Sequence, residues 1–130
     1  MGSRSIILVV DDEPANFRLL EGILRSPDYR IEFARGGMEG LAAVSALCPD
    51  LVLLDVMMPE VDGWQATRTI RAREQGGEAS YIVALTANAF AEDRERCRAA
   101  GMDDFLTKPI DAQRLLAIAE RFTRRASPDR

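Results

Sequence analysis

Short apolar runs alternate with helix-periodic segments along almost the whole chain. Three runs, residues 6–10, 51–54 and 81–85, are continuous and mostly branched, which is typical of strands buried on both faces. Two weaker runs lie at 31–33 and 105–107. This alternation constrains the fold more than any single residue does, because consecutive strand–helix units pack as a parallel sheet with right-handed crossovers.

The segments between the runs carry helix boundary signals. Pro14 suits a first helical turn, Gly101 a left-handed cap and Asp111 an N-terminal cap. We therefore predict an α/β fold: one doubly wound (βα)5 domain, a five-stranded parallel sheet with helices on both faces. The expected boundaries are an N-terminal extension over 1–5, the domain over 6–123 and a charged tail over 124–130.

Composition excludes several classes of protein. The 21 acidic residues outnumber the 17 Lys and Arg, which argues against nucleic-acid binding by this domain. No apolar run approaches the roughly 20 residues of a membrane helix, so we expect no membrane contact and a cytoplasmic location. Cys48 and Cys97 fit no disulfide framework and are interpreted as buried thiols in a reduced compartment.

The chain has 0 histidines. Their absence excludes a Ser-His-Asp triad, general acid–base catalysis by histidine, and most zinc and haem sites.

Polar residues instead gather where the predicted strands end. Ligands of parallel sheets bind beyond the carboxyl ends of the strands, so we expect these side chains to meet there. Taken singly, each has a structural alternative such as helix capping; their joint occurrence at successive strand ends favours a site. The residues concerned are Asp11, Asp12, Glu13, Asp55, Thr86 and Lys108.

Clustered carboxylates have a chemical consequence. At about 5 Å, each pair repels by about 3 kcal/mol at an effective dielectric of roughly 20. Such a cluster raises its pKa values or binds a cation, and oxygen ligands without imidazole or thiolate select Mg²⁺ or Mn²⁺. With a lysine and a hydroxyl nearby, the site suits phosphoryl transfer to a carboxylate.

The motifs resemble the receiver domain of two-component response regulators, of the chemotaxis-regulator type. The resemblance runs from about residue 6 to 122 and rests on Asp11-Asp12, the run 53–59, Asp62-Gly63, Thr86-Ala87 and Lys108-Pro109. Segments 82–89 and 100–105 are similar to receivers of hybrid sensor histidine kinases. The resemblance implies strand order 2-1-3-4-5.

The resemblance also implies a role for each site residue. Asp55 would be the phosphoacceptor. Asp12, Asp55 and the backbone carbonyl of Met57 would ligate Mg²⁺, with Mn²⁺ as the substitute cation, and Asp11 would act largely through water. Lys108 would pair with a phosphoryl oxygen.

Two further residues, Thr86 and Phe105, would form the switch that follows phosphorylation. The surface formed by the fourth helix, last strand and fifth helix would then change. Arg94, Arg96 and Arg98 on that helix suit either a partner-facing or a simply solvated surface.

The implied partners are a phosphodonor and a recipient of the signal. The donor would be a phosphohistidine of a histidine kinase or histidine phosphotransfer domain, and the recipient a downstream protein or fused module. The domain would not be an enzyme beyond its own phosphorylation and slow dephosphorylation. Stand-alone regulator and hybrid-kinase receiver both remain open, as does oligomeric state.

Two rival functions are disfavoured by particular residues. A metal-dependent aspartyl-phosphate phosphohydrolase is disfavoured because Met57, two residues after Asp55, cannot transfer a proton. A flavodoxin-like nucleotide or flavin binder is disfavoured because the acidic loop 11–13 would repel phosphate.

Overall fold

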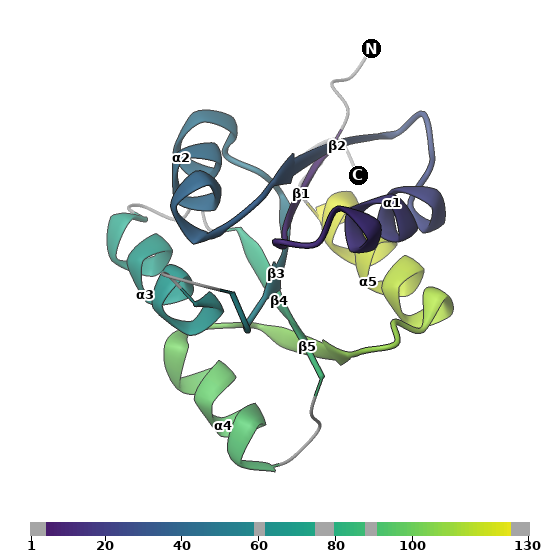
Figure 1. Ribbon diagram of the computed structural model, residues 1–130. Coiled ribbons are helices and arrows are strands. Elements are labelled where there is room, and N and C mark those ends of the chain that lie inside the picture. The colour runs from purple at the N-terminus through teal and green to yellow at the C-terminus, as the bar shows by residue number, and fades with distance from the viewer. Residues whose placement is uncertain (1–4, 59–61, 75–79, 88–90, 126–130) are drawn as a thin grey trace.

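The computed structural model describes residues 5–58, 62–74, 80–87 and 91–125. Strands and helices alternate strictly along the chain (Figure 1). The strands are β1 (Ser5–Val10), β2 (Tyr29–Ala34), β3 (Leu51–Asp55), β4 (Tyr81–Thr86) and β5 (Asp104–Thr107). The helices are α1 (Pro14–Ile23), α2 (Gly37–Leu47), α3 (Gly63–Arg73), α4 (Ala91–Ala100) and α5 (Ala112–Arg125).

The strands form one parallel sheet of order β2-β1-β3-β4-β5. Helices α2, α3 and α4 cover one face, and α1 and α5 cover the other (Figure 1). The predicted α/β class, strand order and two-sided helical cover are therefore confirmed. No helix among the described residues is both long and apolar enough to span a membrane.

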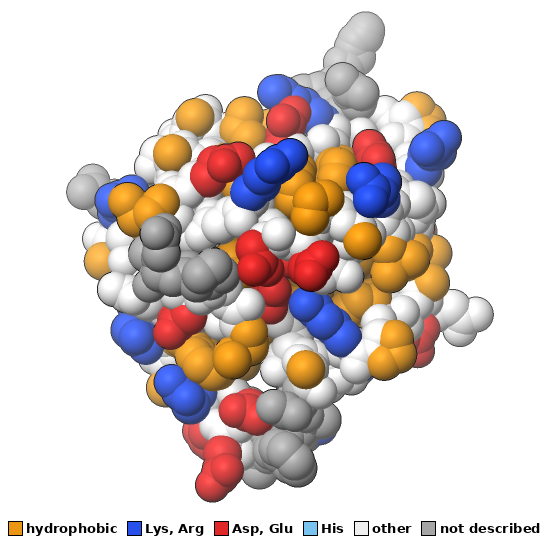
Figure 2. All heavy atoms as spheres, in the orientation of Figure 1, with side chains coloured by type: hydrophobic (Ala, Val, Ile, Leu, Met, Phe, Trp, Pro, Cys, Tyr) orange, Lys and Arg blue, Asp and Glu red, His pale blue; other side chains and the backbone are white. Residues whose placement is uncertain are grey.

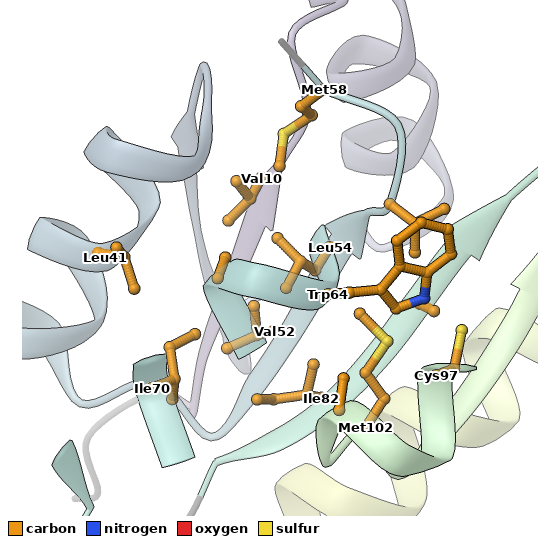
Figure 3. Packing of buried hydrophobic residues seen from close by; sticks show 14 of the residues in the cluster. Val10, Leu41, Val52, Leu54, Met58, Trp64, Ile70, Ile82, Cys97 and Met102 are labelled. Atoms are coloured by element: carbon orange, nitrogen blue, oxygen red, sulfur yellow. The ribbon is translucent and has the colours of Figure 1, made fainter. Parts of the chain in front are cut away.

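The core has two halves because successive side chains of a strand point to opposite faces. Leu54 and Ile82 point toward α2–α4, where they meet Trp64 of α3 and Cys97 of α4 (Figure 3). The intervening residues of the same strands point toward α1 and α5. The central strands are thus buried on both sides, as their continuous apolar runs predict.

Several boundaries differ from the prediction. β2 covers six residues because it pairs with β1 along its full length, whereas its sequence indicates only 31–33. β1 begins at Ser5, within the expected extension, and α5 continues to Arg125, within the expected tail. Residues 1–4 and 126–130 lie outside the described residues.

The two cysteines also have different surroundings. Cys97 is buried as predicted, but Cys48 is exposed. Cys48 caps the C-terminus of α2 with φ 48, and this left-handed turn presents its side chain to solvent.

Arg71 joins three segments at the edge of the sheet opposite the polar strand ends. Its guanidinium donates to the carbonyl oxygens of Gly101 and Ser80, both at 2.9 Å, and to Asp103 Oδ2 at 2.7 Å. Asp103 Oδ2 also accepts from the Ile82 amide at 2.8 Å. The end of α3, the start of β4 and the α4–β5 turn are therefore held together by one side chain.

We predict that Gly101→Ala destabilises the protein by about 1–2 kcal/mol. Gly101 has φ 104, and a Cβ atom there would lie 2.9 Å from Arg71 Cγ. Urea unfolding measures the loss. The control is Gly22→Ala, in α1 with nothing within 4 Å of its Cβ position, which should stabilise by about 0.5–1 kcal/mol. Equal effects of the two substitutions would contradict the role of backbone conformation at Gly101.

Candidate functional site

Four strands deliver polar residues to the same edge of the sheet. Asp11 follows β1, Asp55 ends β3, Thr86 ends β4 and Lys108 follows β5. One carboxylate oxygen from each of Asp11, Asp12 and Asp55 lies within 4.8 Å of the others. Figure 2 shows acidic side chains gathered at the middle of this face, with a basic side chain beside them. The strand-end residues predicted from sequence therefore do converge.

Lys108 is the cation of this cluster. Its Nζ lies 3.5 Å from Asp55 Oδ2 and 3.7 Å from Asp11 Oδ2. Asp11 and Asp55 are buried, with 0% and 4% exposure, whereas Asp12 is exposed. The site is thus a buried carboxylate pair bridged by one ammonium group, with a third carboxylate facing solvent.

The backbone after β3 fixes the position of Asp55. The Met57 amide donates to Asp55 Oδ1 at 3.1 Å, while the Met57 side chain is 67% exposed. Gly63, which opens α3, packs directly on this loop, and its amide donates to the Val56 carbonyl at 3.1 Å. A Cβ atom at Gly63 would lie 2.6 Å from the Asp55 carbonyl oxygen, so only glycine fits there.

Asp11 is held by groups from the start of α1. The Glu13 amide donates to Asp11 Oδ1 at 2.9 Å, and Asn16 Nδ2 donates to Oδ2 at 3.1 Å. The predicted cluster did not include Asn16. The available signal was its place in the first turn of a helix opened by Pro14, which carries it back over the end of β1.

Burial raises the pKa of the Asp55 carboxyl above its ordinary 3.8. The Met57 amide and Lys108 oppose this rise, and the neighbouring Asp11 charge reinforces it. A bound divalent cation would relieve the repulsion between these carboxylates. The donor set, all oxygen, fits Mg²⁺ rather than a metal that prefers nitrogen or sulfur.

The two predicted switch residues lie on the same face of the sheet. Phe105 pairs with Ala84 across β4 and β5, and Thr86 is two residues beyond Ala84, so their side chains point toward the α4 side. The Lys108 amide donates to the Thr86 carbonyl at 2.8 Å, which joins the two strand ends. The guanidinium of Arg94 in α4 lies 4.7 Å from the Phe105 ring centroid. Strand β5 and helix α4 are therefore in contact through Phe105 and Arg94.

Comparison with known proteins identifies the family. The model of the response regulator receiver domain matches residues 7–120. The chain belongs to this family. Among curated relatives, it is 40% identical to the sensor protein GacS of Pseudomonas syringae pv. syringae, a match that covers 95% of this chain. It is 45% identical to the sensor histidine kinase RcsC of Salmonella typhi, over 89% of this chain. The chain spans only 14% and 12% of those two proteins.

Solved structures agree. The chemotaxis protein CheY4 of Vibrio cholerae has a TM-score of 0.83 and 27% identity, covering 92% of this chain and 99% of its own. The receiver domain of the sensor histidine kinase PA1611 of Pseudomonas aeruginosa PAO1 has a TM-score of 0.81 and 39% identity, with coverages of 93% and 98%. That domain is described with a magnesium ion coordinated in its active site cleft. The expected receiver function is thus confirmed over the rival functions.

The raised pKa of Asp55 gives a prediction about stability and pH. The folded chain holds this proton at a higher pH than the unfolded chain, so the free energy of unfolding falls as pH rises between the two pKa values. The penalty grows across this window and is fully present once the pH exceeds the folded pKa. Asp55→Asn, which keeps an acceptor for the Met57 amide, should raise Tm at pH 7 without divalent cations.

Thermal melts from pH 3 to 8 in EDTA measure this effect. The variant should lose less stability than the parent as pH rises from about 4, the ordinary carboxyl value. Asp28→Asn, at an exposed carboxylate beyond α1, is the control and should leave the pH profile unchanged. A lower Tm for Asp55→Asn at pH 7 would contradict the electrostatic account.

Proposed function

We propose that Asp55 is the phosphoacceptor of this receiver domain. The observation that carries the proposal is the position of its carboxylate, 3.5 Å from the Lys108 ammonium and with an oxygen within 4.8 Å of the other two carboxylates. The site is open on the Asp12 side, where a donor can approach. Asp55 ends the central strand β3, so a change there is transmitted directly to the sheet.

We propose that Asp12, Asp55 and the backbone carbonyl of Met57 hold Mg²⁺, with Asp11 acting largely through water, and that Mn²⁺ substitutes for it. The carboxylate oxygens within 4.8 Å of one another support this assignment. When bound, the cation neutralises negative charge on the phosphoryl oxygens.

The residues of the chain then have distinct tasks. A carboxylate oxygen of Asp55 attacks phosphorus; the new O–P bond forms as the N–P bond to the donor imidazole breaks, and the imidazole nitrogen keeps the electron pair. Lys108 already faces Asp55 Oδ2, so its ammonium can pair with an oxygen of the group attached there.

Loss of the phosphoryl group should be slow. Hydrolysis is faster when a side chain near the acyl phosphate can remove a proton from water, and Met57 has no group that does so. We therefore propose that the domain is not an enzyme beyond its own phosphorylation and slow dephosphorylation. A long-lived acyl phosphate suits a signal.

The signal would pass through Thr86 and Phe105 to the surface of α4, β5 and α5. Thr86 is 4% exposed at the site, and Phe105 lies on the same face of the sheet under Arg94 of α4. Movement of Thr86 toward the phosphoryl group leaves space beside Phe105, and α4 follows the ring.

The phosphodonor would be a phosphohistidine of a histidine kinase or histidine phosphotransfer domain. The chain has no histidine of its own, and its relatives include sensor histidine kinases. The recipient of the signal would be a downstream protein or a fused module. We place this exchange in the cytoplasm, where the two free thiols stay reduced.

Incubation with Mg²⁺ and acetyl phosphate should add one phosphoryl group to the chain, measured by intact mass. Asp55→Asn and removal of Mg²⁺ should each abolish the gain, because one removes the nucleophile and the other the charge neutralisation. Asp28→Asn is the matched control, since it removes an exposed carboxylate away from the cluster. A phosphoryl group that persists on Asp55→Asn would overturn the assignment.

Lys108→Ala should leave the phosphoryl group attached but weaken the conformational response. The response can be followed through Trp64, the single tryptophan, whose ring lies 3.7 Å from the Arg96 guanidinium of α4. We expect a fluorescence change on phosphorylation in the parent and a smaller one in Lys108→Ala at equal phosphorylation by mass. An undiminished change would remove Lys108 from the switch.

A further inference from the structure

The carboxylate of Asp11 is fully buried and is hydrogen-bonded by donors of the protein. Its exposed fraction is 0%, and its two oxygens have different partners. Oδ1 accepts from the Glu13 amide at 2.9 Å, while Oδ2 faces Asn16 Nδ2 at 3.1 Å and Lys108 Nζ at 3.7 Å. Within the part of the chain that the structure describes, the side-chain amide of Asn16 alone is within hydrogen-bond distance of Oδ2. The side chain of Asn16 is therefore the direct partner of that oxygen.

Lys108 faces two carboxylates and forms a close ion pair with neither. Its Nζ lies 3.5 Å from Asp55 Oδ2 and 3.7 Å from Asp11 Oδ2. When an oxygen of a phosphoryl group on Asp55 attracts the ammonium, Asp11 loses its share of that charge. A buried carboxylate left with too few donors is unfavourable and turns toward any other donor in reach. Something other than Lys108 must keep Asp11 in place.

We propose that Asn16 is the positioning residue of Asp11: its amide orients the carboxylate for Mg²⁺ and keeps Oδ2 hydrogen-bonded when Lys108 moves to the phosphoryl group. This rests on the proposed function, because it assigns a task within that site. An uncharged amide is suited to the task, since it holds the carboxylate without repelling a cation that approaches it.

The fold holds Asn16 in position independently of the carboxylates. The backbone N–H of Asn16 donates to the Glu13 carbonyl at 3.0 Å, in the first turn of α1. The next residue, Phe17, stacks on Phe33 of β2 with ring centroids 4.4 Å apart and planes inclined by 19°. That stack holds the start of α1 against the sheet, and the side-chain amide of Asn16 therefore has a fixed position relative to Asp11.

The test compares Asn16→Leu, of nearly the same size without a donor, with Asn16→Gln, which keeps the amide. Mg²⁺ affinity of the unphosphorylated chain is measured by titration calorimetry. Asn16→Leu should raise the Kd for Mg²⁺ about tenfold, in the range found when partners that orient metal ligands are removed. Asn16→Gln should recover most of the affinity because the half-buried side chain has room for one more methylene. Arg18→Ala, exposed on the same helix, should bind Mg²⁺ like the parent.

The second readout is the phosphorylation rate with acetyl phosphate as Mg²⁺ is varied. Asn16→Leu should need about tenfold more Mg²⁺ for the half-maximal rate, in line with its Kd. Thermal melts in EDTA identify any variant that fails to fold. If Asn16→Leu does not fold, Asn16→Gln and Asn16→Ser are compared instead. The affinity for Mg²⁺ should then be lower for Asn16→Ser, whose donor sits on a shorter side chain.

Failure of this proposal differs from failure of the proposed function. If the parent is phosphorylated on Asp55 and folded Asn16→Leu has an unchanged Kd, Asn16 does not position Asp11. A parent that binds Mg²⁺ but takes up no phosphoryl group overturns the proposed function alone. A parent that binds no Mg²⁺ overturns the role of Asn16 as well.

Discussion

The structure depends on close approach of carboxylates that repel one another. Asp11 and Asp55 are buried at the ends of neighbouring parallel strands, and in the folded chain Lys108 is the ammonium that faces both. Like charges at this distance cost free energy, so the fold must supply compensating interactions. It does so with backbone amides from Glu13 and Met57. The site is therefore preorganised for a cation and under electrostatic stress without one.

Apolar packing of the sheet offsets the free-energy cost of bringing these carboxylates together. The central strands are buried on both faces, and the apolar contacts of the two halves of the core hold the strand ends in register. Helix α4 is held differently: of its described side chains, Cys97 and Ala100 are buried, and two of its arginines, Arg94 and Arg96, lie over the rings of Phe105 and Trp64. Cation–π contacts of this kind are each worth about 0.5–1 kcal/mol when exposed. The helix that would change position thus has little apolar anchoring among its described side chains.

The sequence was sufficient for the fold class and the convergence of the acidic residues, because continuous apolar runs identify buried parallel strands and such strands end at one edge. The length of β2 could not be predicted, since an edge strand has mixed burial and a weak pattern. The tertiary contacts of Gly63, Asn16 and Arg71 were missed for another reason. Each acts through contacts with residues from other segments, and no local pattern records the partner.

Lys108 is the only lysine in the chain; every other basic side chain is arginine. Arginine serves the peripheral ion pairs, where a planar fork binds several acceptors, and the compact ammonium is kept for the acidic cluster. Its side chain is 29% exposed, so reagents in solution can reach it. Amine-directed chemistry will therefore find one side-chain target in this chain, inside the acidic cluster, besides the α-amino group at its N-terminus.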